Sequence, residues 1–339
     1  GAKRILIWMD TPEDVLGLAT LYLRIYFLGM TAMMLYNFGS AILRAIGDTR
    51  RPLYYLSAAG VINVVLNLLF VITFRMDVAG VAAATVISQC ISAFLIIRCM
   101  MKEQSDIRLE LSALHIYPDK FRRILQIGLP ASFQGIVFSF SNVIIQSSVN
   151  SFGAVTVAGN SAAANIEGFV YVSMNAFHQA AISFTSQNVG AAKYERVNRI
   201  LYTAQACVIT VGVVFGNLAV LCGYPLLGMY TSSSAVMEAG MKRLAVICRY
   251  YALCGMMDVI VGSLRGLGYA MMPMIVSLIG ACGLRLVWIF TFFRMESFHT
   301  TTSLYMTYPV SWIVTFLAHV VCFIIVRRKL ERKWNCVKA

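Results

Sequence analysis

The chain has 339 residues, of which 59% are hydrophobic and only 13% are charged. A soluble domain carries about 25% charged residues, so the composition excludes an ordinary soluble protein and favours a multi-pass membrane protein. The formal net charge of +13 does not indicate nucleic-acid binding, because the basic residues cluster in alternate loops, as the positive-inside bias predicts.

Apolar runs of about 20 residues follow one another along the chain, each long enough to cross ~30 Å of hydrocarbon as a helix. Only helices and closed barrels satisfy their backbone in lipid, and uninterrupted runs of this length predict helices. The end of one span lies at Ile5–Trp8. Nine further spans are predicted at about 15–46, 53–73, 78–101, 124–150, 157–189, 200–224, 236–264, 274–293 and 303–326.

A short turn between two of these runs has a second copy. The first copy is Leu43-Arg-Ala-Ile-Gly-Asp-Thr-Arg-Arg-Pro52, and the second is Leu264-Arg-Gly-Leu-Gly-Tyr-Ala-Met-Met-Pro273. Leu, Arg, Gly and Pro recur at the same four positions. We therefore predict two lobes that are parallel repeats, an arrangement used by transporters with a midplane site. The register of the copies also predicts that about 100 residues of the first of two six-helix lobes are missing from this chain.

The spans divide the chain into four predicted parts. They are the remainder of a first lobe at 1–101, a polar cytoplasmic linker at 102–123, a second lobe at 124–326 and a basic cytoplasmic tail at 327–339. The scattered cysteines show neither metal-binding nor disulfide spacing, so we expect no metal site and no cofactor.

Two further motifs accompany the repeated turns, Gly128-Leu-Pro-Ala-Ser-Phe-Gln134 and Gln187-Asn-Val-Gly-Ala191. Together the four motifs resemble the MATE (multidrug and toxic compound extrusion) family, and its bacterial branch in particular. The resemblance implies a twelve-helix antiporter that exports organic, often cationic, drugs in exchange for H⁺ or Na⁺. It implies a monomer in the bacterial inner membrane, with small-molecule substrates, a lipid bilayer around it and a cytoplasmic C-terminus.

Acidic residues inside spans are the first candidates for chemistry, because a charge in hydrocarbon costs roughly 2.5–3.5 kcal/mol on insertion scales. Glu167 and Asp258 are the two clear cases. We predict that they bind the coupling cation, as a proton on a buried carboxylate or as Na⁺. The alternative is a structural contact between packed helices. Arg285 is a possible ion-pair partner for either acid.

Polar side chains recur at helical spacing on the spans 124–150 and 157–189. Residues three, four or seven apart share one face of a helix, so each stripe faces protein or a water-filled cavity. We predict that the two stripes line one cavity, the alternative being polar contacts that hold helices together. The cavity-lining candidates are Gln134, Asn142, Gln146, Asn160, Tyr171, Asn175 and His178.

The first repeated turn holds four charged residues with two open interpretations. Arg44, Asp48, Arg50 and Arg51 either pair across the turn and help to close a cytoplasmic gate, or anchor the topology by positive charge.

These patterns favour a secondary antiporter and no enzymatic activity. The nearest alternative is a flippase for lipid-linked oligosaccharides with the same two-lobe plan, which would need a strongly cationic cavity. A membrane-embedded enzyme is a weaker alternative, because the four histidines are scattered and form no cluster of metal ligands.

Overall fold

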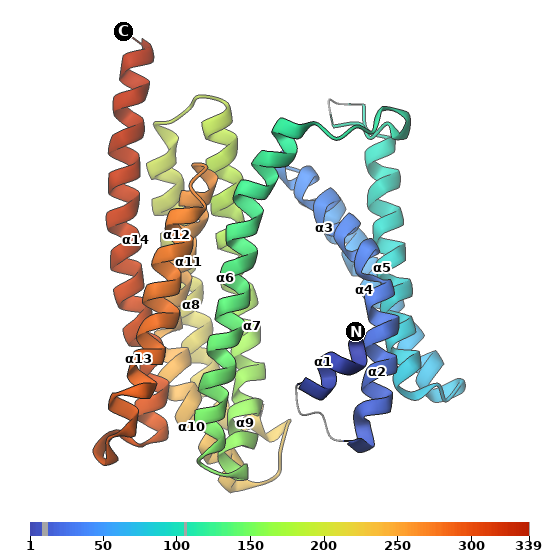
Figure 1. Ribbon diagram of the computed structural model, residues 1–339, viewed down its shortest axis with the longest axis vertical. Helices are drawn as coiled ribbons and strands as arrows, with labels where there is room; N and C mark the ends of the chain where they lie inside the picture. Colours follow the sequence, from blue (N-terminus) through green and yellow to red (C-terminus); the bar gives the residue numbers. More distant parts are fainter. Residues whose placement is uncertain (9–12, 105–106, 339) are drawn as a thin grey trace. The chain divides into compact units, whose positions relative to one another are not determined.

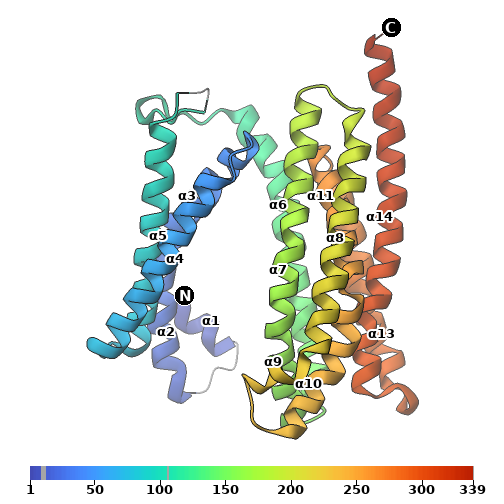
Figure 2. The same ribbon diagram turned by 180° about the vertical axis from the view of Figure 1, so that it is seen from behind.

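The computed structural model describes residues 1–8, 13–104 and 107–338. Residues 9–12, between the first two predicted spans, lie outside these ranges, as do residues 105–106 of the predicted linker and residue 339 of the predicted tail. The described residues are helical and contain no strand, which confirms the all-α prediction. The chain divides into two compact units, Gly1–His115 and Ile116–Ala339, and the division falls inside the predicted linker. Figures 1 and 2 show the helices of each unit from opposite sides.

The first unit is organised around one helix on which the others pack. Its helices are α1 (Ala2–Trp8), α2 (Glu13–Leu28), α3 (Met30–Ala45), α4 (Arg50–Leu68) and α5 (Asp77–Met101). α2, α3 and α4 all contact α5. The predicted continuous span at 15–46 is instead bent by 43° between α2 and α3. A Cβ at Gly29 would lie 2.7 Å from Gln89 Oε1 on α5, so the glycine permits close packing at the bend.

The second unit is a larger helical bundle. Its helices are α6 (Pro118–Asn150), α7 (Ala154–Gly190), α8 (Arg196–Leu221), α9 (Gly223–Gly228), α10 (Ser234–Ile247), α11 (Tyr251–Gly266), α12 (Met271–Ser277), α13 (Leu284–Phe290) and α14 (Thr301–Lys338). A 3₁₀ turn at Cys248–Tyr250 joins α10 to α11, and a π-helical turn at Leu278–Gly283 joins α12 to α13. α11 contacts α7, α8 and α14, and therefore lies at the centre of this unit.

Among the described residues, seven helical segments are long and apolar enough to cross a membrane, and an eighth crossing results if the bent pair α2 and α3 counts as one. The multi-pass prediction is confirmed. The predicted span at 157–189 corresponds to α7, which has 37 residues but is not among the seven. Its polar residues, which include Asn160, Glu167, Asn175 and His178, lower its hydropathy, and these four line the cavity described below.

Two helices extend beyond their predicted ends. α6 begins at Pro118 rather than near residue 124, because proline is well suited to the first turn of a helix. α14 continues to Lys338 rather than ending near residue 326. The charged residues end the apolar run, but Arg, Lys, Leu and Glu are strong helix formers, so the backbone stays helical beyond the predicted span.

The first repeated turn ends α3 with a left-handed glycine. Gly47 has a φ of 91°. Its N–H donates to the carbonyl of Arg44 at 3.0 Å, and the N–H of Asp48 donates to the carbonyl of Leu43 at 3.0 Å. This pair of hydrogen bonds is the Schellman motif, which satisfies the last carbonyls of a helix.

The second repeated turn has the same backbone geometry at the end of α11. Gly268 has a φ of 89°. Its N–H donates to the carbonyl of Arg265 at 2.9 Å, and the N–H of Tyr269 donates to the carbonyl of Leu264 at 3.0 Å. The sequence repeat therefore corresponds to one turn built twice, and its glycine recurs because this φ is costly for a residue with a Cβ.

A matched pair of substitutions tests this backbone effect. Gly268→Ala is expected to lower the free energy of unfolding by about 1–2 kcal/mol, the cost of a left-handed L-residue, because a Cβ there has open space and only the backbone is strained. Ala192, at the end of α7, has a φ of 55°, so Ala192→Gly is expected to relieve strain. Thermal unfolding in detergent should show opposite shifts, and shifts of the same sign would contradict this explanation.

Close packing of small residues fixes α10 against α7. A Cβ at Gly159 would lie 2.6 Å from the carbonyl oxygen of Val236 and 2.7 Å from the backbone nitrogen of Gly240. Membrane helices commonly approach each other through such small residues. The backbones of α7 and α10 are therefore close enough for polar side chains of the two helices to contact each other inside the unit.

Candidate functional site

A cavity of about 660 Å³ lies among the helices of the second unit. Its volume is within the ~300–1,000 Å³ range of small-molecule sites. The two polar stripes predicted from the sequence both contribute to its wall. The residues from the sequence analysis that line it are Gln134, Asn142, Gln146, Asn160, Glu167, Tyr171, Asn175, His178, Asp258 and Arg285.

One wall of the cavity contains a buried ion pair between α7 and α10. Arg243 Nε donates to Glu167 Oε1 at 2.8 Å, and Arg243 Nη2 donates to Glu167 Oε2 at 2.7 Å. Only 5% of Glu167 and 8% of Arg243 is exposed. This fork-to-fork geometry uses both carboxylate oxygens, which makes it a strong and directional contact.

A chain of amides extends the ion pair toward α6. Arg243 Nη1 donates to Asn160 Oδ1 at 2.6 Å, and Asn160 Nδ2 donates to Gln146 Oε1 at 3.0 Å. The guanidinium of Arg243 also lies 5.6 Å from the centre of the Tyr305 ring. Glu167 is therefore held in a connected polar network, as the structural alternative in the sequence analysis describes.

Asp258, on α11, is the other carboxylate that lines the cavity. Among the described residues, no hydrogen bond or ion pair reaches its side-chain oxygens. Arg265 lies seven residues further on the same helix and interacts with Asp258 electrostatically, without an ion pair within 4.0 Å among the described residues. Glu167 and Asp258 therefore differ. Glu167 forms an ion pair with Arg243, whereas the carboxylate of Asp258 lines the cavity without a direct ion-pair partner among the described residues.

His178 fixes α7 against α11 beside this carboxylate. Its Nδ1 lies 2.6 Å from the backbone carbonyl oxygen of Asp258. A carbonyl oxygen only accepts, so Nδ1 carries the hydrogen and the ring orientation is set. A Cβ at Gly262 would lie 2.7 Å from the carbonyl oxygen of His178. His178 lines the cavity, and its Nδ1 is occupied by this contact.

The ion-pair role predicted for Arg285 is wrong within the described part of the chain. The partner of Glu167 is Arg243, and Arg285 Nε donates to Ser311 Oγ at 2.9 Å. The Arg285 guanidinium lies 4.3 Å from the centre of the Tyr308 ring, which gives a cation–π contact. The physical reason is the way the helices pack. α10 places Arg243 opposite Glu167 on α7, whereas α13 packs on α14, so Arg285 contacts α14 side chains instead.

Two arginines that line the cavity, Arg243 and Arg265, were not predicted from the sequence as cavity residues. Arg243 lies inside the predicted span at 236–264, beside Lys242, and lines the cavity from α10. Arg265 belongs to the second repeated turn, yet its Nη2 donates to Gln134 Oε1 at 2.7 Å. Its spacing of seven from Asp258 places both on one face of α11, and this was the available signal.

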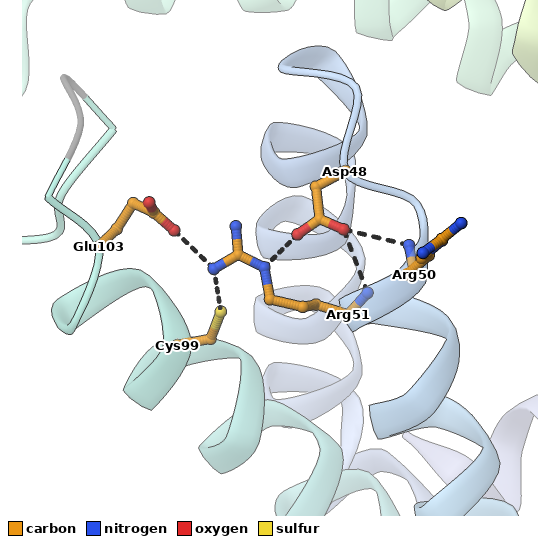
Figure 3. Close-up of polar contacts among 5 residues, drawn as sticks. All are labelled: Asp48, Arg50, Arg51, Cys99 and Glu103. Atoms are coloured by element: carbon orange, nitrogen blue, oxygen red, sulfur yellow. Dashed lines mark hydrogen bonds and ion pairs between the residues drawn. The ribbon is translucent and has the colours of Figure 1, made fainter.

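The charged residues of the first repeated turn form ion pairs within the first unit (Figure 3). Arg51 pairs with Asp48 and, at 2.6 Å, with Glu103 after α5. Asp48 Oδ1 also accepts the backbone N–H groups of Arg50 and Arg51 at 3.1 and 3.2 Å. Asp48 and Arg51 therefore form an ion pair across the turn, as one of the two interpretations predicts. The closing of a cytoplasmic gate by these residues stays a prediction.

These contacts set the ionisation of Asp48. Its partial burial acts to raise the pKa of the carboxyl, but the hydrogen bonds and charge of Arg51 outweigh burial and hold the pKa below its ordinary value. A lowered carboxyl pKa stabilises the fold above the unfolded value, and this contribution is lost as pH falls through the folded value. Asp48 is therefore ionised and paired with Arg51 at neutral pH.

The sequence of this chain is similar to those of known proteins. A model of the MatE family matches residues 2–69 and 130–291. The chain is 32% identical over 291 residues to the probable multidrug resistance protein YpnP of Bacillus subtilis, covering 84% of this chain and 63% of that protein. It is 22% identical over 262 residues to the multidrug export protein MepA of Staphylococcus aureus, covering 75% and 56%.

Solved structures share the fold. The Vibrio cholerae MATE transporter VcmN in the bent form matches with a TM-score of 0.85 and 17% identity, over 98% of this chain and 74% of that chain. An outward-facing multidrug resistance MATE family transporter matches with a TM-score of 0.88 and 18% identity, over 97% and 74%. The chain spans only 61–63% of the length of the first curated relatives that it matches.

Proposed function

Because the chain belongs to the MATE family, we propose that the whole protein exports small organic molecules in exchange for H⁺ or Na⁺. The names of its curated relatives as multidrug resistance and export proteins support this proposal. The same proposal includes a monomer in the bacterial inner membrane. It also includes a cytoplasmic C-terminus, because the end of α14 is basic and basic ends favour the cytoplasmic side.

The observation that carries the proposal is the carboxylate of Asp258 in a polar cavity of small-molecule size. A coupling cation and a cationic substrate compete for one carboxylate, so binding of either weakens binding of the other. Two unit charges 4 Å apart interact by roughly 4 kcal/mol at an effective dielectric constant of 20. Competition of this size is sufficient to couple entry of the ion to release of the drug.

The charge balance of the cavity favours an exporter over a flippase for lipid-linked oligosaccharides. Three arginines and two carboxylates line it. Glu167 neutralises Arg243, and the charge of Asp258 offsets that of Arg265. A diphosphate headgroup would be better served by several uncompensated cations, and Arg285 alone lacks an acidic neighbour among the described residues.

The decisive experiment is drug export by the full-length protein in vesicles with each ion gradient collapsed in turn. We expect ethidium export to stop when the gradient of the coupling ion is collapsed and to continue when the other is collapsed. Export that persists without either gradient would overturn antiport. Transport of a lipid-linked sugar analogue in place of ethidium would favour the flippase.

A further inference from the structure

A second cavity, of about 430 Å³, forms a groove on the second unit, apart from the polar cavity. α8 and α14 form its walls and α11 forms its floor, since residues of all three helices line it and α11 contacts both α8 and α14. The lining residues are Asn198, Leu201, Tyr202, Gln205, Met256, Ile260, Phe316, Val320, Phe323, Ile324, Arg327 and Arg328. The groove is thus apolar along most of its length and basic at one end.

The length of the groove matches one leaflet of a bilayer. Its α14 wall runs from Phe316 to Arg327, which at 1.5 Å per residue is about 16 Å. One leaflet contributes about half of the ~30 Å hydrocarbon core. Both walls are open to the outside of the unit, because Tyr202 on α8 is 70% exposed and Ile324 on α14 is 44% exposed. These positions would face lipid tails in a membrane.

The basic end lies where the apolar run of α14 stops. Arg327 Nε donates to Asn198 Oδ1 at 3.1 Å, and its Nη2 lies 3.3 Å from Glu331 Oε1. Arg327 therefore ties α14 to α8 and has part of its charge offset. Arg328 is exposed, and among the described residues it forms no ion pair with an acid. The end of the groove thus carries a net positive charge.

We propose that this groove binds an anionic phospholipid, with its phosphate at Arg327 and Arg328 and one acyl chain along Phe316–Ile324. The apolar length fits the chain, and the basic end fits the headgroup at the level where a headgroup lies. Basic pockets between membrane helices are suited to anionic headgroups, and each Lys or Arg near the surface contributes about 1 kcal/mol. The ligand thereby joins α8 to α14 across α11, which also carries Asp258.

The headgroup contact is tested by native mass spectrometry of the purified chain titrated with dioleoyl phosphatidylglycerol. We expect a bound phosphatidylglycerol, weaker binding of dioleoyl phosphatidylcholine, and about fivefold weaker phosphatidylglycerol binding in Arg328→Gln, the loss of one favourable charge. Lys329→Gln is the matched control, because it removes one charge from the adjacent position off the groove. Equal phosphatidylglycerol affinity in the two variants would overturn the headgroup assignment.

The acyl-chain contact is tested by a second matched pair on exposed positions of α14. Ile324 lines the groove, whereas Ile325 is exposed but does not. Ile324→Trp is expected to fill the groove and lower binding of phosphatidylglycerol, while Ile325→Trp leaves binding unchanged. Both variants place tryptophan at a lipid-facing position, so both should fold. Unchanged binding in Ile324→Trp would overturn the groove as the site.

Discussion

Replacing Asp258 with Asn is expected to abolish ion-coupled export while leaving the fold intact. The carboxylate lines the cavity and forms no ion pair or hydrogen bond among the described residues, so an isosteric amide breaks no direct contact, and Arg265 keeps its hydrogen bond to Gln134. Export of ethidium by the full-length protein should fall by about 100-fold or more, because the variant loses an attraction of roughly 4 kcal/mol for a cation. Thermal unfolding of the same preparation should be unchanged.

The control for Asp258→Asn is Asp258→Glu, which keeps the charge and moves it by one methylene. We expect the glutamate variant to retain partial export. Full export by Asp258→Asn would exclude Asp258 as the coupling residue. A fall in the unfolding temperature together with lost export would instead indicate that the carboxylate stabilises the bundle.

Breaking the buried ion pair between Glu167 and Arg243 should have the largest effect on stability in this chain. Removing one partner of a buried pair leaves an uncompensated charge and costs about 3–5 kcal/mol. Glu167→Gln leaves the buried Arg243 cation opposite a neutral amide, and Arg243→Met leaves a buried carboxylate. Both single variants should unfold at clearly lower temperature in detergent, and Arg243→Met should be the less stable because it also orphans Asn160.

The double variant Glu167→Met with Arg243→Met measures how much the ion pair itself contributes to stability. Replacing a whole buried ion pair with apolar residues of similar volume is often neutral, so the double variant should recover most of the stability lost in either single variant. The interaction energy from this double-mutant cycle should be large, as expected for side chains in direct contact. If Glu167→Gln keeps its stability but loses export, Glu167 binds the coupling ion and the ion pair is dispensable.

The two experiments together assign different roles to two acids that were equivalent in the sequence. Each is a single carboxylate in an apolar run, and the cost of placing a charge in hydrocarbon is the same for both. Their difference depends on which side chain another helix places opposite. Glu167 forms a direct ion pair with a residue 76 positions away, whereas among the described residues Asp258 has only the electrostatic interaction with Arg265.

The sequence by itself determined the helices, the repeated turn and the polar stripes. These follow from local rules, since hydrocarbon thickness sets span length, a left-handed glycine sets the turn, and helical periodicity puts Asn160, Glu167 and Tyr171 on one face. The bend at Gly29 was not predicted, because a glycine inside an apolar run gives no sign of the helix it packs against.

Only the tertiary structure decided the pairing of charges and the place of the second cavity. Arg243 meets Glu167 because Gly159 and Gly240 let α7 and α10 approach closely, and Arg265 reaches Gln134 from the end of a repeated turn. Such contacts depend on the depth and rotation of helices far apart in sequence. Periodicity fixes the face of one helix, but the register between two helices is set by side-chain packing.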